Sequence, residues 1–191
     1  MAAETTKLDQ LRDYARLQLR AGIVSGTDLR ADIRAAVTDE LPSAADPEGI
    51  VESWLDEAAA ELARDQRSWP SRTDHDRLEA AFADLEAAGI VVLRVCDDHW
   101  SAHAELKRRA EAGTRPVGIA WFTPPDVWHA IDNGMLEINL WHGDTANVAP
   151  GDELLDTVLL ALAKHGLPAH FDEGRIEVAA FWQRRLPVDA R

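Results

Sequence analysis

A cluster of polar side chains that could do chemistry lies in the stretch Trp69–Leu93, which reads WPSRTDHDRLEAAFADLEAAGIVVL. Thr73, Asp74, His75 and Asp76 follow one another there, just ahead of an apolar helical pattern. Imidazole and carboxylate groups bind metal ions and act as general acids or bases. Thr73 and Asp76 also have the spacing of a helix capping box, with aspartate in place of the usual glutamate. The sequence therefore offers two interpretations of this cluster, a ligand site and a helix cap.

Capping is the interpretation that the rest of the chain favours. The same threonine- or serine-to-aspartate spacing recurs at Ser25-x-x-Asp28 and at Thr123-x-x-Asp126. Acidic side chains in a first helical turn also complement the helix dipole. We therefore expect residues 73–76 to act mainly as a helix start.

Apolar periodicity indicates the elements that position these residues. Apolar residues spaced three or four apart predict helices through most of residues 1–68, which we interpret as a helical N-terminal section. Residues 69–191 alternate between helical and strand patterns, and we interpret them as a second section. Helices are predicted at 76–88, 98–112, 124–131 and 152–165, strands at 90–96, 115–122 and 135–141, and a final hairpin around Gly174.

This alternation predicts a sheet of about four to five strands covered by helices, as in layered helix–sheet folds. Strand 90–96 is almost wholly apolar, as expected of a strand covered on both faces. The terminal hairpin makes the sheet mixed. The expected fold class is therefore α+β, with α/β as the neighbouring alternative.

A shared rim of polar residues follows if the first three strands are parallel. Helix 76–88 would then begin near the carboxyl ends of these strands, where open helix–sheet folds place their ligand sites. The candidate rim consists of Asp74, His75, Asp76, Asp98, His99, His142 and Asp144. An antiparallel third strand would send His142 to the other edge.

Other catalytic patterns are weak. His99 and His103 have the spacing of a helical metal pair, but no glutamate follows His99 as in zinc proteases. Cys96 lies next to acidic residues that should raise the pKa of its thiol, which makes it a poor nucleophile. We expect a small core residue there, and neither a cofactor nor a bound metal.

Tryptophan usage points to binding instead. The chain has seven tryptophans and one tyrosine. On strand 135–141, Trp141 shares a face with Glu137 and Asn139, so it should be half-exposed, as interface anchors often are. The candidate interface residues are Trp121, Trp128 and Trp141.

The composition limits which classes of ligand and which cellular location are expected. The net charge is −14, and the longest basic run is Lys107–Arg109, so nucleic acid is not expected as a ligand. The chain lacks an apolar run of membrane-spanning length and a signal-peptide core, which predicts a cytoplasmic protein. Its single cysteine excludes a disulfide framework within the chain. Homo-oligomers are compatible with these properties.

The pattern W-P-x-x-T-D-x-D-R-L-x-x-A-F-x-x-L-E-A-A-G-I-V-x-L at residues 69–93, with the closing FWQRRL at 181–186, resembles an uncharacterised bacterial family of domains of unknown function. The resemblance covers most of the chain. It implies a segment with a histidine, a glutamine and an aspartate at positions matching 121–130. Here Asp126 is retained, but Thr123 and Pro125 stand in place of the other two. This member would then have lost any site formed by those side chains.

The sequence therefore favours a non-catalytic, acidic protein-binding or regulatory module, for example one that neutralises a toxin. The alternative is a small-molecule or metal-dependent enzyme that uses the polar rim. Metal content and the effect of changing His99 or Trp141 would separate the two.

Overall fold

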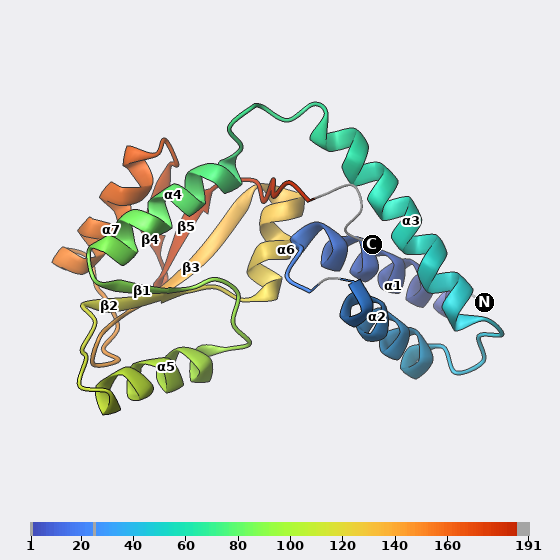
Figure 1. The fold of residues 1–191 in the computed structure, drawn as a ribbon, viewed down its shortest axis with the longest axis horizontal. Helices are drawn as coiled ribbons and strands as arrows, with labels where there is room; N and C mark the ends of the chain where they lie inside the picture. The colour runs from blue at the N-terminus through green and yellow to red at the C-terminus, as the bar shows by residue number, and fades with distance from the viewer. Residues whose placement is uncertain (1, 25, 187–191) are drawn as a thin grey trace. The chain divides into compact units, whose positions relative to one another are not determined.

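The computed structural model describes residues 2–24 and 26–186, which divide into two compact units (Figure 1). The helical unit comprises residues 2–24, 26–70 and 184–186, and the sheet unit comprises Ser71–Gln183. The last residues of the described chain thus belong to the first unit. Within the described residues, no helix is both long and apolar enough to cross a membrane.

The helical unit is built from α1 (Ala2–Ala21), α2 (Gly26–Glu40) and α3 (Pro47–Gln66). Asp46 caps α3 by accepting a hydrogen bond from the Gly49 amide at 2.9 Å, and Pro47 occupies the first turn, where its missing N–H costs nothing. Each helix contributes an apolar stripe to one core, whose buried residues are Leu11, Ala15, Leu19, Leu29, Ile33, Val37, Val51, Leu55, Ala58 and Leu62.

The C-terminal segment packs on this core at a glycine. Gly22 has a φ of +63°, and a Cβ there would lie 2.7 Å from the Leu186 side chain. Arg184 donates to the Gly22 carbonyl at 2.6 Å, and Arg185 donates to the Pro70 carbonyl at 2.5 Å. The backbone conformation therefore favours glycine at position 22, and a larger residue there would also displace the Leu186 side chain.

The sheet unit contains four helices and five strands. They are α4 (Asp74–Ala87), β1 (Ile90–Leu93), α5 (His99–Glu111), β2 (Gly118–Trp121), α6 (Pro124–Asn133), β3 (Met135–His142), α7 (Glu153–Lys164), β4 (Ala169–Asp172) and β5 (Arg175–Ala179). The strand order is β1-β2-β3-β5-β4. Strands β1 and β2 are parallel, and every other neighbouring pair is antiparallel. The expected α+β fold with a mixed sheet is confirmed.

Helices cover the two faces of this sheet unequally. Figure 1 shows α4 and α7 on one side of the strands and α5 on the other. The α4–α7 side buries the fully enclosed side chains of Phe82, Leu85 and Leu162, and each such burial stabilises the fold by about 1.5–3 kcal/mol. On the α5 side, Ala102 and Leu106 pack against Val91, Ile119 and Trp121. The α5 side thus has its own small core over β1 and β2.

The third strand is antiparallel, which is the alternative under which His142 leaves the predicted rim. β3 runs antiparallel to β2, with His142 opposite Gly118 and Asn139 opposite Trp121. α6 and Gly134, which has a φ of +69°, connect the two strands, and the chain re-enters the sheet beside the end of β2 that it left. A parallel third strand would require the connection to return to the opposite end of β2 before it re-enters the sheet.

Candidate functional site

The Thr73–Asp76 cluster forms the start of α4. The Thr73 hydroxyl accepts from the Asp76 amide at 3.2 Å, and Asp76 Oδ2 accepts from the Thr73 amide at 2.8 Å. Thr73 is completely buried. This reciprocal pair is a capping box, which satisfies two amides that the helix itself leaves unpaired. The predicted capping role is confirmed.

Asp74 and His75 hold the end of the sheet unit. Asp74 Oδ2 accepts from the Phe181 amide at 3.2 Å, and its other oxygen accepts from Arg77 at 3.2 Å. The His75 ring packs edge-on against Trp182, with 4.7 Å between ring centroids. These two side chains therefore contact the segment that follows β5.

Asp98 and Asp144 also bind nearby amides. Asp98 accepts from the Trp100 and Ser101 amides at 2.9 and 3.1 Å and so caps α5. Asp144 accepts from the Ala146 amide at 3.1 Å in the turn after β3. Both carboxylates thus complete local backbone structure.

His142 lies opposite Gly118, at the start of β2, because β3 is antiparallel. Its Nε2 is 3.1 Å from Asp152 Oδ2, which also accepts from the Ala149 amide at 2.7 Å. These contacts, the amide first, hold the pKa of Asp152 below its ordinary value. His142 and Asp144 therefore do not join Asp74, His75, Asp76, Asp98 and His99, and the predicted seven-residue rim does not form. Among the described residues, no three His, Cys, Asp or Glu side chains gather closely enough to hold a metal ion.

α6, like α4, begins with a capping box. Asp126 Oδ2 accepts from both the amide and the hydroxyl of Thr123 at 2.7 Å. Asp126, the acidic residue retained from the resembled family, is thus engaged in capping. The third predicted box involves Ser25, which lies outside the described residues.

Cys96 packs beside the small core under α5. Burial is the main cause that raises the pKa of its thiol, and the charge of Asp97 adds to it. The Cys96 sulfur lies 3.4 Å from the Asp98 carbonyl, to which it donates. The predicted direction of the pKa shift is confirmed, and the thiol stays protonated at neutral pH.

A continuous row of aromatic rings leads from the sheet core to the surface. Trp121 and Trp141 meet with ring centroids 4.4 Å apart, His99 lies 6.4 Å from Trp141, and Trp100 lies 4.7 Å from His99. Trp121 is 3% exposed, so this predicted interface residue is buried, whereas Trp100 is 65% exposed. We call Trp121, Trp141, His99 and Trp100 the aromatic ladder. Each offset or edge-on ring pair contributes about 0.5–1.5 kcal/mol beyond its burial.

Sequence reasoning missed Trp100, the exposed end of this ladder. Its position next to His99 on a polar helix face was the available signal, but nothing local showed that this face lies beside Trp141. Trp128, the remaining predicted interface residue, is half-buried on α6 and outside the ladder as defined.

The sheet surface beside Trp141 is polar. The residues of β3, β5 and β4 that alternate with the core positions are Glu137, Asn139, Arg175, Glu177, His170 and Asp172. Arg175 forms an ion pair with Glu137, which is the main cause of its raised pKa. His170 lies 3.4 Å from Glu177. The ladder is therefore bordered by a charged, partly exposed strand surface.

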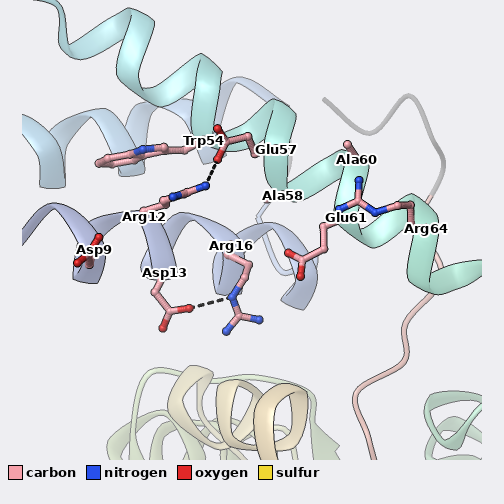
Figure 2. A pocket seen from close by; sticks show the side chains of 10 residues that line it. All are labelled: Asp9, Arg12, Asp13, Arg16, Trp54, Glu57, Ala58, Ala60, Glu61 and Arg64. Atoms are coloured by element: carbon pink, nitrogen blue, oxygen red, sulfur yellow. Dashed lines mark hydrogen bonds and ion pairs between the residues drawn. The ribbon is translucent and has the colours of Figure 1, made fainter.

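The helical unit carries a separate groove of about 550 Å³ between α1 and α3. Figure 2 shows Trp54 beside this groove and Arg12 reaching across from α1 to Glu57 on α3. Arg16 binds Asp13 at 2.8 Å along the same helix. Paired charges of both signs line most of the groove, so it shows no preference for one ligand charge.

The fold and these surfaces define an α+β protein with a helical unit, a helix-covered mixed sheet and an aromatic surface patch. Residues 4–186 match the family described as Domain of unknown function (DUF6891), and the chain belongs to this family. The expected membership of a family of unknown function is thus confirmed. No curated protein and no solved structure matches the chain significantly.

Proposed function

We propose that this protein is a non-catalytic, cytoplasmic binding module that docks a protein partner on the aromatic ladder. The observation that carries the proposal is Trp100, a tryptophan 65% exposed at the end of a row of packed rings. Large aromatic side chains held by neighbouring rings lose little entropy on binding, and tryptophan is enriched among residues that dominate interface energies.

Charge narrows the kind of partner. The chain has a net charge of −14, and Glu137 and Glu177 lie on the strand surface next to Trp141. A partner with a basic surface around an apolar pocket for Trp100 complements both features, and its association rate would fall as salt screens the attraction. Regulators that bind and neutralise a basic protein fit this description.

Affinity capture of partners followed by titration tests the proposal. The tagged protein retrieves partners from a cell lysate, and the affinity of each purified partner is then measured for the native chain and for Trp100→Ala. We expect Trp100→Ala to weaken binding about tenfold or more. Leu160→Ala is a matched control, because Leu160 is 72% exposed on α7, on the other side of the sheet.

The control variant, together with association rates measured at increasing salt concentrations, gives two further tests of the proposal. Leu160→Ala should leave the affinity unchanged within about twofold. If each partner binds Trp100→Ala as tightly as the native chain, the aromatic ladder is not the docking surface. An association rate that does not change with salt would argue against a basic partner.

A further inference from the structure

The first strand lies at one edge of the sheet. The strand order places β1 and β4 at the two edges. Successive residues of a strand direct their backbone groups to opposite sides, so half of the amide and carbonyl groups of Ile90–Leu93 point away from β2. Such groups are ready to pair with another strand unless the protein protects them.

The two edges differ in protection. β4 carries the charged Asp172, and charged side chains on an edge strand discourage pairing. β1 reads Ile-Val-Val-Leu, with neither a charged residue nor a proline. The edge at β1 is therefore the one suited to accept an added strand.

A groove of about 440 Å³ runs along this edge. Its floor is Ile90–Leu93, one wall is the last turn of α4 at Glu86, and the other is the end of α5 with the segment leading into β2. Val117, on that second wall, is 58% exposed. The groove thus combines a backbone edge with an exposed apolar side chain, the two features by which sheet edges bind extended peptides.

The second wall is basic. Arg109 and Arg115 both line the groove. Arg109 is bound to Glu105 at 2.7 Å, whereas Arg115 has no ion-pair partner among the described residues. On the opposite wall the charge of Glu86 is compensated by Arg94 at 2.7 Å. An uncompensated positive charge therefore borders the edge of β1 in a chain whose net charge is −14.

We propose that the β1 groove binds an extended acidic segment of a partner protein, which adds a strand to the sheet at Ile90–Leu93. Backbone pairing to β1 would supply affinity, and Arg115 would select acidic side chains. A second copy of this chain is a poorer occupant, because a twofold contact would join two chains of charge −14 that carry the same basic wall. This surface is distinct from the aromatic ladder, so each proposal can fail alone.

Fluorescence anisotropy with labelled peptides tests the occupant. One peptide alternates valine and glutamate over about eight residues, enough to span the four residues of β1, and its match alternates valine and lysine. We expect the glutamate peptide to bind about tenfold or more tightly than the lysine peptide, and Arg115→Glu to reverse this order. Equal binding of both peptides, or of neither, would overturn the proposal.

A matched variant distinguishes the effect of a charge in the groove from the effect of the net charge of the protein. Lys107→Glu makes the same change in charge on the exposed side of α5, away from the residues that line the groove. It should reduce the affinity of the glutamate peptide far less than Arg115→Glu does, with circular dichroism showing that both variants are folded. If both variants lose the same affinity for the glutamate peptide, then the net charge of the protein governs binding and the proposal is wrong.

Methylation of alternate peptide amides tests strand addition without changing the protein. A strand paired to β1 uses every second amide, so methylating one alternate set should abolish binding and methylating the other should not. Hydrogen exchange should show new protection at alternate amides of Ile90–Leu93. Equal tolerance of both methylated sets would contradict strand addition. A dimer that the peptide dissociates would make a second copy the occupant and overturn the proposal.

Discussion

The Phe181 backbone amide donates a hydrogen bond to Asp74 Oδ2 at 3.2 Å, across 107 positions of the sequence. The Trp182 ring, one residue further on, packs against His75 at 4.7 Å between centroids. Two side chains that resemble metal ligands thus anchor the segment after β5 to the first turn of α4. Their chemistry serves the fold of the sheet unit, as the buried capping box beside them does.

Replacing Thr73 by alanine should destabilise the protein. The substitution removes the hydroxyl that accepts from the Asp76 amide, in a position that is completely buried. Loss of such a cap costs about 1–2 kcal/mol, to be measured as the free energy of unfolding in urea. Thr73→Ser keeps the hydroxyl and should lose less. Equal stability of Thr73→Ala and the native chain would contradict the importance of the capping box.

Ion pairs on α5 should stabilise the protein in a defined range of pH. Arg108 and then Arg109 bind Glu105 and lower the pKa of its carboxyl to about 2, below the ordinary value of about 4.3. Because the pKa of Glu105 is lower in the folded state, its ion pairs contribute fully to the free energy of unfolding above about pH 4.3. This contribution is lost as the pH falls towards 2. Solvent screening limits it to a few tenths of a kcal/mol for each exposed pair.

Urea unfolding of Glu105→Gln across this range measures the effect. The variant should be less stable than the native chain at pH 7 and equally stable near pH 2. Glu111→Gln, on the same helix, serves as the control for changing a glutamate. A Glu105→Gln deficit that persists unchanged at pH 2 would show that the ionised carboxylate is not its source.

Cys96 should react slowly with alkylating reagents at neutral pH. Burial and the charge of Asp97 raise the pKa of its thiol, and only the thiolate is nucleophilic. The rate with iodoacetamide should therefore rise with pH beyond the ordinary thiol midpoint of about 8.5. Asp97→Asn should increase the rate near that midpoint, because it removes a like charge. A rate at pH 7 equal to that of free cysteine would rule out the shift.

Much of the fold could be predicted because its signals are local. The capping boxes at Thr73 and Thr123 join groups only three residues apart, so spacing alone identifies them. The alternation along β3 likewise placed Trp141 on the face of Glu137 and Asn139. Side-chain periodicity reports which face of an element is apolar, and this sufficed for a helical section followed by a helix-covered mixed sheet.

The candidate site was only partly predictable, because it depends on contacts between distant segments. Trp121 and Trp141 were expected at an interface, but Trp121 is buried. His99 and Trp100 join these rings only because α5 packs over β2. No pattern within residues 98–112 encodes that packing, since it forms with strands that lie elsewhere in the sequence.

The direction of β3 shows most clearly the difference between what local sequence signals predict and what contacts between distant segments decide. Its apolar alternation is identical in a parallel and an antiparallel strand, so the sequence by itself determined that residues 135–141 form a strand and which side chains it buries. Only the tertiary structure decided that it runs antiparallel to β2 and places His142 opposite Gly118, at the start of that strand. The physical reason is that strand direction depends on backbone pairing between segments and on the path of α6, which side-chain periodicity does not record.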